Sequence, residues 1–393
     1  MRLASQASVG VLSLEMATNV SNNTIASSSP APQCQVFSEP YTEQVLKCVA
    51  YSIIMFCSLV GNVLVICVVL LNRHMRTVTN YLIVNMAVAD LLITAFNMPI
   101  TITVIAGSQI QWSESVAAEM LCKFMPFSQS LSIASSVLSL TAIAVDRFLA
   151  VMYPLKRYIS FHAAYVLIVF VWIVGIAVNS PFLYAQKIIA SEENGAYCAE
   201  IWTPVFGENA AKDFTIVLFV LFYAVPLLTM SILYSFVVYK LWVRKVPGNQ
   251  TTENQLRAEK SRKKVLKMLL VVVTLFALCW LPVYITQFIW FFGSERFPCG
   301  PPSVLAFLAF FLGHTNSALN PAIYVIFNSN FRKGFRDVLL CRCRRRNRVN
   351  VVPQNLPGTH GTAFGADNTS LNTSPIALSR FRGSSKTSTA LRR

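Results

Sequence analysis

The sequence predicts an all-α membrane protein, a bundle of seven transmembrane helices followed by a short amphipathic eighth helix. Of its 393 residues, 54% are hydrophobic and only 13% are charged, and the mean hydropathy is +0.54, whereas a soluble domain carries about 25% charged residues. Seven long stretches contain no Asp, Glu, Lys or Arg. None of them shows the two-residue alternation of a membrane β-barrel. Lipid is therefore the main solvent of this chain.

Each charge-free stretch is long enough to cross a bilayer, which takes about 20 apolar residues in helical form. Helix is expected because backbone polar groups find no partners in lipid. The stretches are residues 48–72, 91–113, 124–145, 158–186, 214–239, 268–294 and 297–331. The second span is expected to begin near Tyr81, so that it carries Asp90 within the membrane. We place the transmembrane domain at residues 45–329.

The charge distribution predicts that the N-terminus lies outside the cell. With that orientation all but six of the 33 Lys and Arg residues are cytoplasmic, as the positive-inside rule requires. Residues 1–44 then form a polar, disordered extracellular segment with glycosylation sequons at Asn19 and Asn22. The net charge of +16 needs no nucleic-acid partner, since the bias of the loops accounts for it.

The chain after the seventh span predicts an amphipathic helix at residues 330–340, lying on the inner leaflet. Its apolar face consists of Phe331, Phe335, Val338 and Leu339. Cys341 and Cys343 follow at the membrane surface, and they are either palmitoylated or unmodified thiols. Residues 341–393 are expected to form a disordered cytoplasmic tail.

Five cysteines are candidates for disulfides on the predicted exterior. Cys122 opens the third span and Cys198 lies in the long loop after the fourth, so these two can pair. Cys34 and Cys299 can form a second bridge, for which Cys48 competes with Cys34.

Asp90 lies in the run Asn85-Met86-Ala87-Val88-Ala89-Asp90-Leu91, and at this point the chain resembles the rhodopsin-like (class A) G-protein-coupled receptors. A buried carboxylate costs about 2.5–3.5 kcal/mol in a membrane, so it must face the bundle interior. Each other span carries a similar family motif in order: Gly61-Asn62-Val63, Asp146-Arg147-Phe148, Trp172, Pro226, Cys279-Trp280-Leu281-Pro282 and Asn320-Pro321-Ala322-Ile323-Tyr324. The resemblance covers residues 45 to about 340.

The resemblance implies which residues carry activation and coupling. Arg147 would be held by Asp146 at rest and released to the G protein when the sixth helix moves, and Phe148 replaces the more common Tyr of that triplet. An ordinary surface ion pair is the alternative. The other residues that the resemblance assigns to activation are Tyr234, Phe276, Trp280, Pro282, Asn320, Pro321 and Tyr324. For the aromatic residues among them, packing of the core is a second reading, and both can hold.

The resemblance also implies an allosteric sodium site, formed by Asp90, Ser136, Asn316 and Ser317. Oxygen ligands suit a hard cation, and its charge would offset that of the carboxylate. The alternative is a hydrogen-bonded network without an ion. No other cofactor is expected.

The class of ligand is inferred from the residue types at the positions that line the ligand cavity in the family. Gln129 stands where amine receptors have an Asp, and His314 stands where opsins have the retinal-binding Lys, so neither chemistry is available. Gln129 resembles the Gln of neuropeptide Y, neuropeptide FF, orexin and RFamide receptors, and Thr101 and Gln287 fall at cavity positions that those receptors also use. Phe310 replaces a His found in several of them, which leaves the pose of the ligand open.

The loop between spans four and five is acidic and includes Glu200, which would attract a cationic peptide. The hypothesis is therefore a receptor for a short, amidated peptide that contains Arg or Lys. Solvated loop charges and hydrogen bonds between helices are the plain alternatives for Glu200 and for the glutamines.

The expected partners are this extracellular peptide, a heterotrimeric G protein, arrestin and a receptor kinase acting on tail Ser and Thr residues, and membrane lipids. The expected location is the plasma membrane. A receptor for a lipid or other small molecule is the main alternative, and a channel or transporter a remote one, because a single intramembrane charge makes a poor transport path. No nucleophile and base set is present in the spans, so no enzyme is expected.

Overall fold

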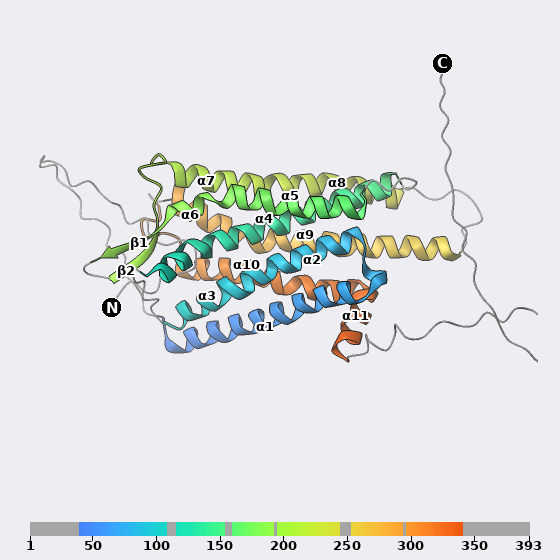
Figure 1. Cartoon of the computed structure of the whole chain (residues 1–393), viewed down its shortest axis with the longest axis horizontal. Coiled ribbons are helices and arrows are strands. Elements are labelled where there is room, and N and C mark those ends of the chain that lie inside the picture. Colours follow the sequence, from blue (N-terminus) through green and yellow to red (C-terminus); the bar gives the residue numbers. More distant parts are fainter. Residues whose placement is uncertain are drawn as a thin grey trace, which may run out of the picture. The chain divides into compact units, whose positions relative to one another are not determined.

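The computed structural model describes residues 39–107, 115–153, 159–191, 195–243, 253–293 and 296–340, all of which belong to one compact unit. In the part of the chain that the structure describes, the helices form seven spans, which run side by side along one axis (Figure 1). They are α1 (Tyr41–Leu71); α2 (Val78–Leu92) continued by η2 (Ile93–Asn97) and α3 (Met98–Ile105); α4 (Val116–Met152); α5 (Phe161–Asn179) with α6 (Pro181–Ala185); α7 (Ala210–Phe219) continued by η3 (Val220–Ala224) and α8 (Val225–Val243); α9 (Glu253–Phe292); and α10 (Ser303–Phe327).

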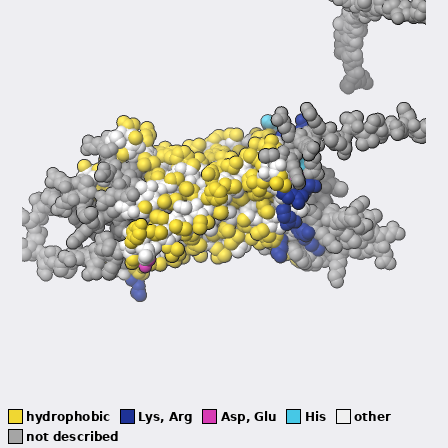
Figure 2. Space-filling model, turned by 90° about the horizontal axis from the view of Figure 1, so that it is seen from below, with side chains coloured by type: hydrophobic (Ala, Val, Ile, Leu, Met, Phe, Trp, Pro, Cys, Tyr) yellow, Lys and Arg dark blue, Asp and Glu magenta, His cyan; other side chains and the backbone are white. Residues whose placement is uncertain are grey.

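Six of these spans are apolar and long enough to cross a membrane among the residues that the structure describes. The seventh, α10, has 25 residues, which is also sufficient length, but it carries a buried polar group of His314, Asn316, Ser317 and Asn320. These side chains lower its mean hydropathy while facing inward. Figure 2 shows the resulting apolar belt, with Lys and Arg gathered at the end that holds α11 (Ser329–Leu339).

Two spans contain a five-residue π-helical turn, and each turn precedes a proline. Pro99 follows η2 by two residues and Pro226 follows η3 by two residues. Proline has no N–H and clashes with the carbonyl four residues earlier, so the wider turn accommodates it. Pro226 thus follows a widened turn, whereas Pro282 lies inside the continuous helix α9.

Several helices are longer than the charge-free stretches that predicted them. α4 begins at Val116, with the Ser115 hydroxyl accepting from Ala118 N at 3.3 Å. Its first turns tolerate charge because Lys123 Nζ pairs with Glu119 Oε1 at 2.6 Å on an exposed face. α9 likewise begins at Glu253, well before the apolar stretch. Absence of charge therefore marks the membrane-embedded part of a helix rather than its ends.

The predicted amphipathic helix is present as α11 and packs against the end of α1. The Asn328 side chain caps it by accepting from Asn330 N at 3.0 Å. Phe331 is buried, and a Cβ atom on Gly334 would collide with Val68 of α1. Leu339, also assigned to the apolar face, is 63% exposed, and its contact with the inner leaflet stays a prediction.

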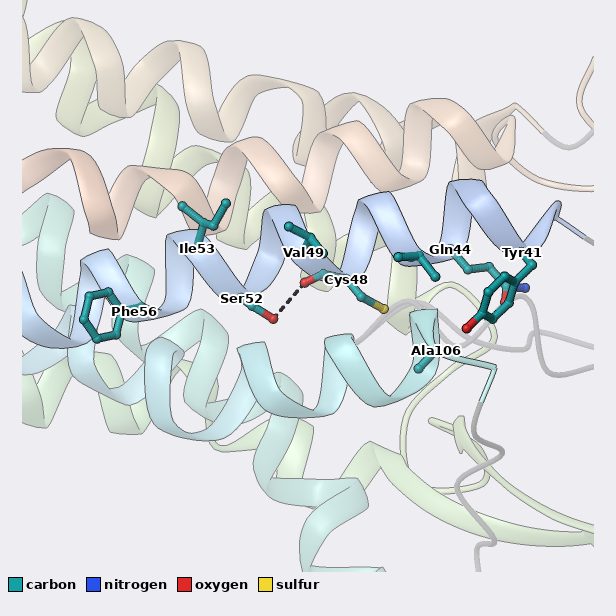
Figure 3. A pocket seen from close by; sticks show the side chains of 9 residues that line it. Tyr41, Gln44, Cys48, Val49, Ser52, Ile53, Phe56 and Ala106 are labelled. Carbon is teal, nitrogen blue, oxygen red and sulfur yellow. Dashed lines mark hydrogen bonds between the residues drawn. The ribbon is translucent and has the colours of Figure 1, made fainter.

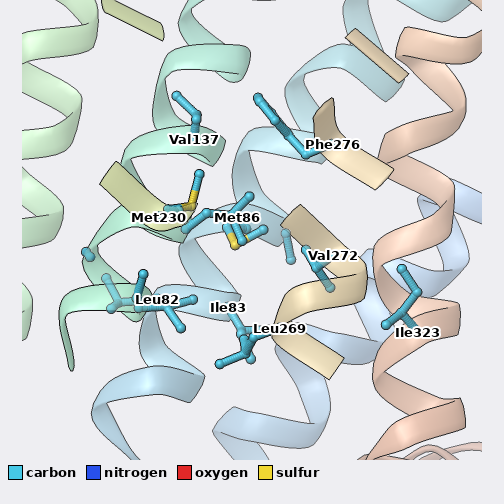
Figure 4. Close-up of a cluster of buried hydrophobic side chains, with 14 of the residues drawn as sticks. Leu82, Ile83, Met86, Val137, Met230, Leu269, Val272, Phe276 and Ile323 are labelled. Carbon is cyan, nitrogen blue, oxygen red and sulfur yellow. The ribbon is translucent and has the colours of Figure 1, made fainter. Parts of the chain in front are cut away.

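An apolar layer fills the half of the bundle nearest α11 (Figure 4). Its side chains come from α2, α4, α8, α9 and α10, and they are Leu82, Ile83, Met86, Val137, Met230, Leu269, Val272, Phe276 and Ile323. All are at most 5% exposed. The polar groups described below lie on either side of this layer.

Candidate ligand cavity and signalling site

A β-hairpin covers the end of the bundle where the predicted exterior lies. Strands β1 (Gln186–Ser191) and β2 (Gly195–Glu200) pair antiparallel, with Ile188 opposite Cys198. The all-α prediction did not include this hairpin, which lies in the loop after the fourth span. The predicted disulfide Cys122–Cys198 is present, with a Cα–Cα distance of 5.8 Å, and it ties β2 to the first turns of α4.

The Cys122–Cys198 disulfide holds β2 against α4 so that Glu200 faces the interior of the bundle. Side chains two residues apart lie on the same face of a strand, so Glu200 shares the face of Cys198. Trp202 Nε1 donates to Glu200 Oε1 at 2.7 Å, and the Trp202 ring packs against Phe214 with centroids 5.0 Å apart. Burial raises the pKa of Glu200 to about 7, although the Trp202 hydrogen bond opposes that rise.

Glu200 lines a cavity together with three other predicted ligand residues, Gln129, Gln287 and Phe310. The cavity has an empty volume of about 680 Å³, including space open to the surroundings. Gln129 is 8% exposed, and its Oε1 has no hydrogen-bond partner among the described residues. Glu200 is the single charged side chain among the described residues that line the cavity. The site therefore offers amide groups and one ionisable carboxyl in an aromatic setting.

The structure places the two remaining predicted ligand residues outside this cavity. The Thr101 hydroxyl donates to Asn97 O of its own helical span at 2.9 Å. His314 is fully buried, one helical turn below Phe310, with its ring 5.8 Å from that of Tyr51. Their role in ligand binding stays a prediction.

Sequence reasoning missed several lining residues, among them Phe182, Phe214, Thr215 and Tyr284. Tyr284 lies four residues after Trp280 and three before Gln287, so the helical period places all three on one face of α9. That spacing could have revealed Tyr284. No comparable signal marks Phe182, because it reaches the cavity from the short helix α6.

Asp90 lies below the cavity within a polar cluster. Its Oδ2 accepts from Asn320 Nδ2 at 2.9 Å, and it is 2% exposed. The oxygens Ser136 Oγ, Asn316 Oδ1 and Ser317 Oγ are buried without a hydrogen-bond partner among the described residues. Buried oxygen atoms and a carboxylate are the types of ligand that suit a hard cation such as sodium, so the chemistry of these residues fits the predicted ion.

Around Asp90 the helices are locked together by further contacts. Asn62 Nδ2 donates to Ser317 O at 3.0 Å and so joins α1 to α10. A Cβ atom on Gly61 would lie 2.8 Å from Pro321, so only glycine permits this close approach. The motif residues Asn320 and Pro321 therefore lie where α10 meets α1 and α2.

At the end of the bundle predicted to be cytoplasmic, Arg147 is engaged by its neighbour Asp146, which is the arrangement that the family resemblance implies at rest. Arg147 Nη2 and Nε both donate to Asp146 Oδ2, and the distance from Nε to Oδ2 is 3.0 Å. Thr79 of α2 completes the network, because its hydroxyl donates to Asp146 Oδ2 at 3.0 Å and accepts from Arg147 Nη2 at 2.7 Å. Thr79 was not foreseen. Phe148 contacts Phe236 of α8, with centroids 6.2 Å apart.

The aromatic residues assigned to activation are buried between the two ends. Phe276 and Trp280 are each 1% exposed, with ring centroids 6.5 Å apart. A Cβ atom on Gly313 would lie 2.9 Å from the Trp280 ring, so Trp280 packs directly on α10. The hydroxyls of Tyr234 and Tyr324 are buried without a partner among the described residues, which leaves both able to bond after a rearrangement.

Several predicted sites lie outside the described residues: the sequons at Asn19 and Asn22, Cys34, and the acylation candidates Cys341 and Cys343. Cys299 is disulfide-bonded, and Cys48 is a free thiol. Cys48 is therefore not the partner of Cys299, and pairing with Cys34 stays a prediction.

Comparison with known proteins agrees with this geometry. Residues 61–324 match the family model described as 7 transmembrane receptor (rhodopsin family). A QRFP-like peptide receptor of Branchiostoma floridae is 35% identical over 78% of this chain and 81% of its own length. Neuropeptide FF receptor 2 of Rattus norvegicus is 34% identical (84% and 78%), and the Substance-K receptor of Homo sapiens is 32% identical (78% and 75%). The chain therefore belongs to the rhodopsin family of seven-transmembrane, G-protein-coupled receptors and is a multi-pass membrane protein.

Proposed function

We propose that this receptor binds a short, C-terminally amidated peptide containing Arg or Lys. The observation that carries the proposal is the placement of Gln129, Gln287 and Glu200 around one cavity. An amide side chain both donates and accepts hydrogen bonds, as a terminal carboxamide does. Gln129 Oε1 accepts no hydrogen bond from the described residues, so it can accept one from the ligand. Glu200 supplies the carboxylate that a guanidinium or ammonium group pairs with.

The relatives support the same ligand class. They are named as receptors for QRFP-like peptides, neuropeptide FF and substance K, and each is matched over at least three quarters of its length. Their shared class makes a peptide the preferred ligand over a lipid or other small molecule.

The test compares an amidated, Arg-containing peptide with its free-acid form and its Arg-to-citrulline form on cells expressing the receptor. Gln129→Leu removes one hydrogen bond and is expected to weaken the amidated peptide about threefold to tenfold, with a smaller effect on the free acid. Glu200→Gln removes the ion pair and is expected to cost about tenfold for the Arg peptide but little for the citrulline peptide.

Glu119→Gln is the matched control, because Glu119 pairs with Lys123 on the exposed surface and should leave affinity unchanged. Equal losses for both peptide forms in each variant would contradict the proposed contacts. A response to lipids but to no peptide would move the receptor to the alternative class.

Binding would be transmitted through Trp280 and Asp90 to Arg147. Trp280 lies one turn below Tyr284, which lines the cavity, and it packs on Gly313 of α10. A shift of α9 would open the cytoplasmic end and free Arg147 from Asp146 and Thr79 for the G protein. A sodium ion held by Asp90, Ser136, Asn316 and Ser317 would supply a positive charge that favours the resting state.

The proposed location is the plasma membrane, with the N-terminus outside and the C-terminus in the cytoplasm. The Lys and Arg residues at one end of the apolar belt (Figure 2) support this orientation. Phosphorylation of the tail by a receptor kinase, arrestin recruitment and contacts with anionic lipid belong to the same proposal. Epitope tags at the two ends, read in intact and permeabilised cells, test the orientation.

A further inference from the structure

A hydrogen bond from a buried tyrosine joins the fifth and sixth spans inside the bundle. The Tyr223 hydroxyl, carried by the π-helical turn η3, donates to Ala277 O of α9 at 2.9 Å. Tyr223 is 8% exposed, and it is not among the described residues that line the ligand cavity. The bond therefore lies beside the cavity and is not part of it.

This bond differs from the usual hydroxyl contact in a membrane span. Ser52 of α1, for example, donates to Cys48 O one turn earlier in its own helix, at 2.8 Å (Figure 3). The phenol ring carries the Tyr223 hydroxyl too far from its own backbone for such a bond, so the hydroxyl reaches a second span. The buried hydroxyls of Tyr234 and Tyr324, by contrast, have no partner among the described residues. The Tyr223 bond thus ties two helices together.

The acceptor, Ala277 O, lies at a weak point of α9. Pro282 follows Ala277 by five residues, and a proline has no N–H to donate to the carbonyl four residues earlier, here Leu278 O. In a membrane, a neighbouring span can supply donors to a helix that is interrupted in this way. Helices also bend where a side chain enters the backbone hydrogen bonds. Both causes of bending meet between Ala277 and Pro282.

Tyr223 contacts α9 on both sides of this weak point. Its hydroxyl bonds to Ala277 before Pro282, and its ring packs on Tyr284 after Pro282, with centroids 4.9 Å apart. The Phe219 ring holds the pair in place, at 5.5 Å from Tyr223 and 5.3 Å from Tyr284. A bend of α9 at Pro282 changes the separation of Ala277 and Tyr284, so Tyr223 cannot keep both contacts unchanged.

We propose that Tyr223 is a latch, whose bond to Ala277 O stabilises the conformation of α9 in which Arg147 is engaged by Asp146. Tyr284 lines the cavity, so a ligand is one ring contact away from the latch. Tyr223 itself is a positioning residue, because it acts through α9. The inference rests on the proposed movement of α9 and is independent of the proposed peptide. A bond present in one conformation and absent from the other shifts the population toward the first.

The test measures basal nucleotide exchange, without any ligand, by the purified full-length receptor and a heterotrimeric G protein. Tyr223→Phe removes the hydroxyl and keeps the ring, and it should raise exchange per receptor about threefold to tenfold, the effect of one hydrogen bond. Para-aminophenylalanine at position 223, introduced by stop-codon suppression, restores an N–H donor and should return exchange toward the wild-type level. A purely structural role of Tyr223 would instead lower exchange and surface expression.

Two further variants serve as controls. Thr229→Val is the matched control in the same span, because the Thr229 hydroxyl donates to Val225 O of its own helix at 2.8 Å, and it should leave exchange unchanged. Thr79→Val is the positive control, because Thr79 accepts from Arg147 Nη2 directly.

Wild-type or reduced exchange in Tyr223→Phe, or an equal rise in Thr229→Val, would overturn the latch. A rise in Thr79→Val without a rise in Tyr223→Phe would also overturn it, and would leave the proposed movement of α9 standing. If Tyr223→Phe does not reach the cell surface, Tyr223→Leu, which also lacks the donor, decides by the same criteria.

Discussion

The ionisation of Glu200 predicts that affinity for a cationic peptide rises with extracellular pH. Burial raises the pKa of this carboxyl to about 7 in the free receptor, and a bound guanidinium favours its charged form and lowers that pKa. The complex therefore holds fewer protons than the free receptor, and binding releases them. Affinity falls as pH drops below 7, because the carboxyl must first lose its proton.

The magnitude follows from the fraction of Glu200 that is charged. With a pKa of about 7, roughly a tenth of the receptors carry the charged form at pH 6 and roughly nine tenths do at pH 8. If the complex titrates well below pH 6, the dissociation constant should rise about tenfold from pH 8 to pH 6, equivalent to about 1.4 kcal/mol.

The assay is equilibrium binding of the Arg peptide to purified receptor at constant ionic strength from pH 6 to 8. Glu200→Gln should flatten the profile, and the citrulline peptide should give a flat profile on the wild type. His314→Phe is the control for the buried imidazole and should leave the slope in place. The same slope in Glu200→Gln, or affinity that increases toward pH 6, would refute the reasoning.

Three further predictions concern the parts that transmit the signal. Raising sodium should lower agonist affinity in the wild type, and Asp90→Asn should remove that dependence; an equal response in both would argue against the ion site. Thr79→Val should raise basal nucleotide exchange about fivefold, since one hydrogen bond of about 1 kcal/mol restrains Arg147, while Arg147→Ala should abolish exchange and retain peptide binding. Cys122→Ser opens the bridge across 76 residues and should cost about 2–5 kcal/mol of stability, read as lost surface expression and a lower melting temperature.

The membrane spans could be predicted because a helix in lipid needs about 20 apolar residues with few or no charges. Long runs without charge gave the number of spans, and Asp90, an ionisable side chain inside a predicted span, showed which helical face points inward. The ends of the helices were harder to predict from the sequence. In α4, for example, Lys123 and Glu119 form an ion pair on an exposed turn of the helix. A charge count alone cannot distinguish such a turn from a loop.

The signalling site was predicted from motif resemblance, whereas much of the ligand cavity was not. Gln129 and Gln287 were identified at matching positions, and the hairpin register explains how Glu200 joins them. Phe182 and Thr79 were not predicted. The contact of Phe182 with the cavity and that of Thr79 with Arg147 depend on how neighbouring helices cross. Thr101 was also predicted from a matching position, but it does not line this cavity, and its hydroxyl donates to Asn97 O one helical turn earlier.

The apolar layer between Trp280 and Arg147 opposes the passage of ions through the bundle. Among the described residues, side chains from five helices close the interior there (Figure 4), and a hydrated ion would have to shed its water to pass. Only motion of the helices can carry information through such a seal. In a membrane that carries a voltage, many copies of this receptor would therefore add no path for ions through this layer.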